Sequence, residues 1–209
     1  MKNFKTKKQQ GYTLIELLVA ITIFATFLAI GGSSLVDVLN LEQKANVLRK
    51  TQQDTRYILE SIVREARNAN GEFVKNGVLK QRVTSAYQFD GSGKFYLVNT
   101  NLETGEIVEK IFYQEGDLIK MDVLTKTMGE TNFSPKESGV ALNKPESLRV
   151  IKLDFNGSVI YNNPSDTELQ LPPFLHVNIE SESGAGLDSD KAELRAHVNL
   201  VSSATPRSY

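Results

Sequence analysis

Residues 2–36 read KNFKTKKQQGYTLIELLVAITIFATFLAIGGSSLV. Four lysines and no acidic residue occur up to Gly11, and Glu16 is the one charged residue between Gly11 and Asp37. A charged side chain inside an apolar membrane segment costs about 2.5–3.5 kcal/mol or more unless it finds a partner. We therefore interpret Glu16 as a functional residue that requires a cationic partner.

The uncharged run from Leu17 to Val36 is long enough to span a membrane. As a helix its 20 residues rise about 30 Å, which is the thickness of the hydrocarbon core of a bilayer. Because lysines precede the run and Asp37 and Glu42 follow it, the positive-inside rule predicts a cytoplasmic amino terminus and an exported remainder. The alternative is a cleaved secretory signal, with the small residues at 29–34 as its processing site.

The stretch KKQQGYTLIELLVAI at 7–21 resembles the leader and first helix of type IV pilins and pseudopilins. The resemblance implies that a prepilin peptidase cuts after Gly11, behind the basic residues Lys7 and Lys8, and methylates the new amino terminus at Tyr12. Phenylalanine is commoner at the position of Tyr12. In the same family a glutamate at the position of Glu16 serves filament assembly, and subunits at the filament tip often lack it.

The spacing of Tyr12 and Glu16 also has a physical interpretation. These two residues lie about one helical turn apart, and N-methylation keeps the positive charge of the new amino terminus. Pairing that ammonium with Glu16 of a neighbouring subunit would offset the desolvation of both groups, which favours one axial register over others. The alternative is that Glu16 reaches the lipid headgroups as a tolerated acid.

A single helix is expected from Tyr12 to about Ala69, because no proline occurs before Pro135. Gly31-Gly32 is its expected weak point, and Asn70-Gly71 its expected end. The apolar stripe that we expect to face a sheet consists of Leu41, Ala45, Leu48, Gln52, Thr55, Leu59, Ile62, Ala66 and Ala69. Residues 56–70 resemble the end of this helix in minor pilins and in J-type minor pseudopilins. Their arginines Arg64 and Arg67 are expected in core-edge packing and local ion pairs, with partner binding as the alternative.

After Gly71 the periodicity changes toward two, which predicts strands. The expected strands are Val78–Thr84, Gly93–Asn99, Ile107–Gln114, Asp117–Leu124, Leu148–Phe155, Phe174–Glu180 and Glu193–Val201. A hairpin is expected at Glu115-Gly116, another turn at residues 90–93, and a long loop or mobile insertion at residues 125–147. The last three strands are expected to be antiparallel.

The sequence therefore predicts an α+β, pilin-like fold. The expected organisation is a leader at 1–11, a transmembrane and assembly helix at 12–36, an amphipathic helix at 37–70, and an extracytoplasmic β-sheet domain at 71–209.

Few residues suggest chemistry. The chain has no cysteine and none of the common nucleophile, phosphate-binding or zinc motifs, so we expect no enzymatic activity and no cofactor. His176 and His197 are expected on the polar faces of their strands, and we consider them as possible neighbours that lack the third ligand a metal site needs. Asp188, Asp190 and Glu193 are weak candidates for a calcium loop, and Asn156-Gly157-Ser158 is interpreted as a hairpin turn rather than as a glycosylated site.

The net charge of the chain is -1, and without residues 1–11 it would carry 20 basic and 25 acidic residues. This acidic balance argues against general nucleic-acid binding.

We expect a minor structural subunit that passes from the cytoplasmic (inner) membrane into a pilus or pseudopilus at the cell surface or periplasm. Its expected partners are other subunits, the prepilin peptidase, the inner-membrane assembly platform and membrane lipid. Roles in adhesion, motility, secretion and competence remain open, as does the alternative of a membrane-anchored enzyme or receptor.

Overall fold

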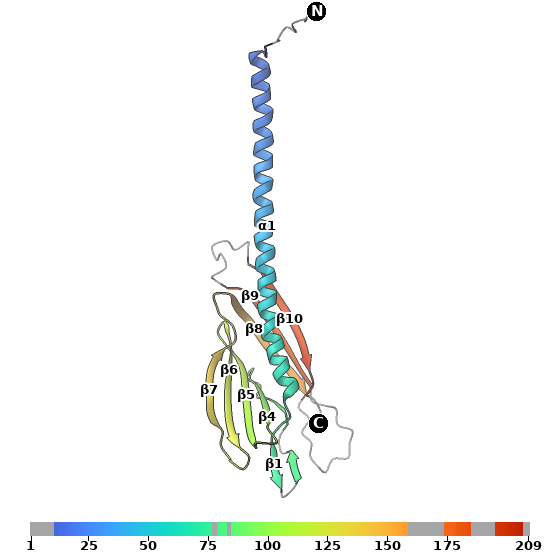
Figure 1. The fold of residues 1–209 in the computed structure, drawn as a ribbon, viewed down its shortest axis with the longest axis vertical. Coiled ribbons are helices and arrows are strands. Elements are labelled where there is room, and N and C mark those ends of the chain that lie inside the picture. Colours follow the sequence, from blue (N-terminus) through green and yellow to red (C-terminus); the bar gives the residue numbers. More distant parts are fainter. Residues whose placement is uncertain (1–10, 77–78, 83–84, 159–173, 185–194, 207–209) are drawn as a thin grey trace, which may run out of the picture. The chain divides into compact units, whose positions relative to one another are not determined.

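The computed structural model describes residues 11–76, 79–82, 85–158, 174–184 and 195–206. The described chain begins with one long helix, α1 (Leu14–Asn68), and continues as strands (Figure 1). The strands are β1 (Phe73–Asn76), β2 (Leu79–Arg82), β3 (Tyr87–Phe89), β4 (Phe95–Thr100), β5 (Glu106–Glu115), β6 (Leu118–Thr127), β7 (Ser134–Ala141), β8 (Leu148–Ser158), β9 (Phe174–Ser183) and β10 (His197–Ala204). The expected α+β fold is confirmed.

The chain divides into two compact units, Met1–Gln43 and Lys44–Tyr209. In the first unit, every described residue from Gly11 to Gln43 is exposed. The hydroxyl groups of this apolar segment bond to its own backbone: Thr22 Oγ1 donates to Leu18 O at 2.8 Å, and Ser33 Oγ donates to Ile30 O at 2.9 Å. Such internal bonds satisfy polar side chains in surroundings that contain no water.

The described residues of the second unit form three antiparallel sheets. A five-stranded sheet has the order β3-β4-β5-β6-β7, a three-stranded sheet has the order β10-β9-β8, and β1 pairs with β2. The expected hairpin is confirmed, because Glu115 pairs with Leu118 and Gly116 adopts a φ of 59° between them. Glycine adopts a positive φ at little steric cost, whereas residues with a Cβ rarely do.

One apolar core joins the carboxy-terminal part of α1 to both larger sheets. Ile62 and Ala66 are fully buried in it, together with Phe112 of β5 and Val177 of β9. The predicted stripe is correct from Thr55 onward. Leu41, Ala45, Leu48 and Gln52 are exposed, and Thr51 is buried instead of Gln52. Thr55 Oγ1 lies 2.7 Å from Ser181 Oγ of β9, so this polar pair is satisfied inside the core.

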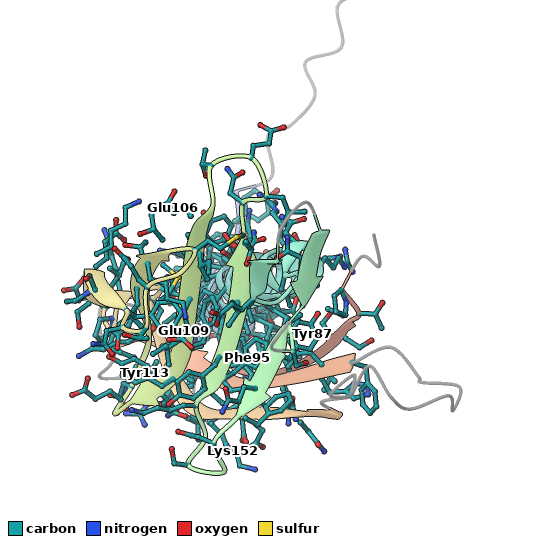
Figure 2. The ribbon with its side chains drawn as sticks, turned by 90° about the horizontal axis from the view of Figure 1, so that it is seen from below. Tyr87, Phe95, Glu106, Glu109, Tyr113 and Lys152 are labelled. Atoms are coloured by element: carbon teal, nitrogen blue, oxygen red, sulfur yellow. The ribbon has the colours of Figure 1, made fainter. Side chains whose placement is uncertain are left out.

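Aromatic side chains fill the space beneath α1. Phe95 is fully buried, and its ring centroid lies 5.5 Å from that of Tyr87, 5.3 Å from that of Phe89 and 5.2 Å from that of Phe155. Figure 2 shows Tyr87 and Phe95 among the side chains between the sheets. Burial raises the pKa of the Tyr87 hydroxyl above its usual range, and this hydroxyl donates to Ala66 O at 2.8 Å. The strand β3 is thereby fixed to the end of the helix.

Two amide side chains connect the five-stranded sheet to β8. Gln114 Nε2 donates to Val150 O and its Oε1 accepts from Leu153 N at 2.9 Å, across the irregular pairing of β8 with β9. Asn143 is buried, and its Oδ1 accepts from Ile119 N at 2.7 Å while its Nδ2 donates to Leu148 O at 2.8 Å. These side chains satisfy backbone groups that no strand partner reaches at this junction.

The expectation of a long loop at residues 125–147 is wrong at its centre, where β7 forms the edge of the five-stranded sheet. The prediction failed because all but one of the residues of β7 are exposed, so its sequence carries no apolar alternation. Its pairing with β6 is irregular around Asp122, whose Oδ1 accepts from Gly139 N at 2.6 Å. Pro135 and Lys136 protect this edge from further pairing.

The interpretation of Asn156-Gly157-Ser158 as a turn is also wrong, because these residues continue β8. Gly157 occurs there for a different reason: a Cβ at this position would overlap the carbonyl of Phe174 and lie 2.9 Å from Phe89 Cζ. The glycine permits close approach of the neighbouring strand.

Replacing Asn143 with alanine leaves the amide of Ile119 without its partner in a buried site. We expect Asn143→Ala to lower the free energy of unfolding by about 1–3 kcal/mol, measured by urea denaturation of the detergent-solubilised chain. The exposed Asn199→Ala is the matched control, with an expected change within about 0.5 kcal/mol. Equal midpoints for both variants would contradict the proposed role of Asn143.

Candidate functional site

The first turn of α1 contains a reciprocal pair of side chains, Thr13 and Glu16. The Oε2 atom of Glu16 accepts hydrogen bonds from both the backbone N and the Oγ1 of Thr13, each at 3.1 Å. Glu16 N donates in turn to Thr13 Oγ1 at 3.3 Å. This arrangement is a capping box, in which a threonine at the N-cap and a glutamate three residues later satisfy the free donors of a helix end.

Sequence reasoning identified Glu16 but missed Thr13. The signal was present, because Thr13-x-x-Glu16 before an apolar run is the sequence pattern of a capping box. Both bonds that Glu16 accepts end on Oε2, so the other carboxylate oxygen is not needed for the cap. The carboxylate also lies at the positive end of the helix dipole, where a negative charge is favourable.

Gly11 and Tyr12 precede the helix, have no regular secondary structure and are exposed. No heavy atom lies within 4 Å of a Cβ built on Gly11, and Tyr12 is 89% exposed. The peptide bond between Gly11 and Tyr12 is therefore accessible to a processing enzyme. Lys7 and Lys8 lie outside the described residues.

The helix behind this segment presents a continuous apolar surface. It is long and apolar enough to cross a membrane, and none of its apolar window is buried. Its large exposed side chains include Leu17, Ile21, Phe24 and Phe27. The helix continues through Gly31 and Gly32 without a break, although each glycine costs about 1 kcal/mol relative to alanine.

The structure separates the two histidines that were expected to adjoin. His176 pairs with Ser203, whereas His197 pairs with Glu182 at the opposite end of the same hairpin. Both are exposed, and His197 Nε2 lies 3.8 Å from Glu182 Oε2. The suggestion that the histidines are neighbours is therefore wrong.

The remaining candidates give no assembled site. The calcium-loop candidates Asp188, Asp190 and Glu193 lie outside the described residues, and within the described ranges no group of three or more potential metal ligands occurs. Arg64 and Arg67 are exposed on α1. The described residues thus leave the amino-terminal turn as the main candidate for function.

Removing the Thr13 side chain should loosen the first turn of α1. We expect Thr13→Ala to cost about 1 kcal/mol of local helix stability, which corresponds to roughly five-fold faster exchange of the amides at Glu16 and Leu17 in detergent micelles, measured by hydrogen exchange. Thr13→Ser retains the hydroxyl and should exchange like the parent. Equal exchange of all three chains would show that the cap does not stabilise this turn.

Comparison with protein families agrees with this geometry. Residues 6–32 match the model of the prokaryotic N-terminal methylation motif. Comparison of the chain with curated proteins and with solved structures gives no match. The match covers Gly11, Tyr12 and the capping box, together with the apolar run as far as Gly32. The chain thus carries the N-terminal methylation motif of the type IV pilin and pseudopilin class, followed by a pilin-like α+β fold.

Proposed function

We propose that this protein is a minor structural subunit of a type IV pilus or pseudopilus, cleaved after Gly11 and N-methylated at Tyr12. The observation that carries the proposal is Glu16, which lies within the methylation motif and is the one acid in an exposed helical segment that is otherwise uncharged. An exposed apolar helix requires membrane or protein around it. The membrane surrounds the helix before assembly, and the packed helices of a filament core surround it afterwards.

Before assembly, the apolar part of α1 anchors the subunit in the cytoplasmic membrane. The helix is long enough for this role, and its hydroxyl groups are bonded to its own backbone. The lysines of the leader keep the amino terminus on the cytoplasmic side. This is where a membrane-embedded prepilin peptidase and an assembly platform would act on the subunit.

Cleavage changes the electrostatics of the helix end. Hydrolysis of the bond after Gly11 produces an ammonium at Tyr12, and methylation retains its charge while it removes a proton donor. The capping box holds the Glu16 carboxylate at the same helix end, through Oε2. In apolar surroundings, the ammonium of a neighbouring subunit and the Glu16 carboxylate each compensate the desolvated charge of the other.

The function is therefore structural rather than enzymatic. Catalysis would need an assembled set of nucleophile, base or metal groups, and the strongest chemical signal in the described residues lies in the assembly segment. The size of the β-sheet region and the irregular edge at β7 favour a minor subunit over the main repeating one. The retained Glu16 favours a place below the filament tip.

Processing predicts a specific amino terminus. We expect the chain purified from membranes to begin at N-methylated Tyr12, as measured by mass spectrometry of its first peptide. An unprocessed chain that still begins at Met1 would favour the alternative, in which the helix only anchors an enzyme or receptor.

Loss of the carboxylate should impair assembly. We expect Glu16→Ala to reduce the amount of this subunit in sheared filaments by at least ten-fold relative to the parent, because the unpaired ammonium of a neighbour would be left in apolar surroundings. Quantitative immunoblotting of sheared and membrane fractions measures this.

Glu42→Ala, which removes an exposed acid farther along α1, is the matched control and should assemble normally. Incorporation of Glu16→Ala at the parental level would refute the assembly role of Glu16.

A further inference from the structure

A second group of charged residues is buried far from the assembly segment in sequence. Lys126 of β6 has a side chain that is 7% exposed, and its Nζ lies 2.7 Å from Oε1 of Glu72, whose side chain is 17% exposed. The same Nζ lies 4.4 Å from the centroid of the Phe133 ring. A primary amine and a carboxyl group are thus held in contact beneath an aromatic cover.

Backbone bonds fix the segment that carries Glu72. Gly71 N donates to Val98 O at 3.0 Å, and Thr100 Oγ1 donates to Gly71 O at 2.7 Å. Asn70 bonds Thr100 through both its amide nitrogen and its carbonyl oxygen. The carboxyl group of Glu72 therefore approaches Lys126 from a rigid attachment to β4.

The residues that lie opposite Lys126 in the sheet are buried. Lys126 opposes Ile107, which is 1% exposed, and Ile107 opposes Thr100, which is 2% exposed. Glu109 opposes Leu124 and is therefore the diagonal neighbour of Lys126 on the same face. Glu109 lies on the five-stranded sheet (Figure 2).

Glu109 supplies a second carboxyl group with altered acidity. Burial raises its pKa, the charge of Glu72 raises it further, and the charge of Lys126 opposes both effects. Glu109 therefore retains its proton at a higher pH than an ordinary glutamate does. A carboxyl group that keeps its proton more readily can donate it and take it back.

We propose that Lys126 and Glu72 condense into a side-chain amide bond, with Glu109 as the proton relay. In the first step one proton moves from Lys126 Nζ to a carboxylate oxygen of Glu72, which gives the amine and the acid that condense. The lone pair of Lys126 Nζ then forms a bond to Cδ of Glu72. Glu109 gives its proton to the departing hydroxyl group and takes one from Nζ, so the products are one amide and one water molecule.

Proximity is what makes this reaction feasible. Well-oriented groups in one molecule react with effective molarities of about 10⁵–10⁸ M, and a site that excludes water disfavours the reverse hydrolysis. The reaction balances without an oxidant, a reductant or a cofactor, since condensation changes no oxidation state.

A second lysine–glutamate pair in the same chain has the same N–O distance but is more exposed. Comparing the two pairs therefore isolates the effect of burial. Lys110 Nζ also lies 2.7 Å from a glutamate oxygen, Oε2 of Glu65, but these side chains are 25% and 36% exposed. Water that reaches this pair stabilises its charged forms and favours hydrolysis. We therefore expect Lys110 and Glu65 to remain an ion pair while Lys126 and Glu72 become linked.

The bond would attach the chain shortly after α1 to the end of β6, the strand beside the edge strand β7. If the protein functions as proposed in a filament, tension on α1 would pass through the bond to β6 instead of only through the hydrogen bonds of β4. The bond itself does not depend on assembly, so its absence would leave the assembly role of Glu16 untouched.

Peptide mapping of the full-length chain from detergent extracts tests the proposal. After denaturation and tryptic digestion, we expect a branched peptide that joins residues 68–75 to residues 121–136 and is lighter than the two free peptides together by one water molecule. Trypsin should cut after Lys110 but not after Lys126. Free 68–75 peptide together with full cleavage after Lys126 would overturn the proposal.

Two variants separate chemistry from structure. Lys126→Arg keeps the charge pair but cannot form this amide, so it should fold and yield no branched peptide. Glu109→Gln removes the relay, and we expect the linked fraction of newly made chain to rise about 10²–10⁴-fold more slowly than in the parent. A parental rate of linkage in Glu109→Gln would remove Glu109 from the mechanism, and a branched peptide at the same position in Lys126→Arg would refute the assigned linkage.

Discussion

The hydrogen bonds from Thr13 to Glu16 hold one carboxylate at the end of a helix whose next charged residue is Asp37. This single charge constrains the amino-terminal unit, because a desolvated carboxylate is unfavourable in every environment that lacks a compensating cation. The capping box compensates it in part with backbone and hydroxyl donors. A cationic chain end from a neighbour would complete the compensation, and it becomes available only after cleavage at Gly11.

The carboxy-terminal unit uses a different source of stability. From Lys44 onward, α1 contributes one apolar face to a core that includes side chains of both larger sheets. Amide side chains at Gln114 and Asn143 satisfy the backbone where the sheets meet. The unit therefore has its own core and its own hydrogen-bond network, while the apolar face of residues 14–36 has no partner in the described residues and is available to lipid or to other helices.

The sequence predicted the elements that have strong periodicity or specific turn chemistry. The long helix, its end near Gly71 and the β5–β6 hairpin follow from the absence of proline, from the glycine at positive φ and from alternating apolar residues. The strand β7 was missed because an exposed edge strand needs no apolar alternation. Gly157 was misread as a turn residue because its role depends on the approach of Phe174, a contact that no local pattern records.

The candidate site was predicted only in part, because one of its two residues stands out in the sequence and the other does not. Glu16 is conspicuous because it is isolated in an apolar run, whereas Thr13 is an ordinary residue whose role appears only with the geometry of the first turn. The pairing of Lys126 with Glu72 joins residues far apart in the sequence and could not be inferred from spacing. Long-range contacts of this kind depend on sheet order, which the sequence does not specify locally.

The central claim is that Glu16 of one subunit neutralises the methylated amino terminus of another within the assembled filament. Determination of the filament structure by electron cryo-microscopy tests it most directly. The account predicts that the nitrogen of Tyr12 lies within about 4 Å of a carboxylate oxygen of Glu16 in a neighbouring subunit, the usual limit of an ion pair. A filament in which Glu16 contacts only Thr13 of its own chain, with every Tyr12 nitrogen paired elsewhere, would contradict it.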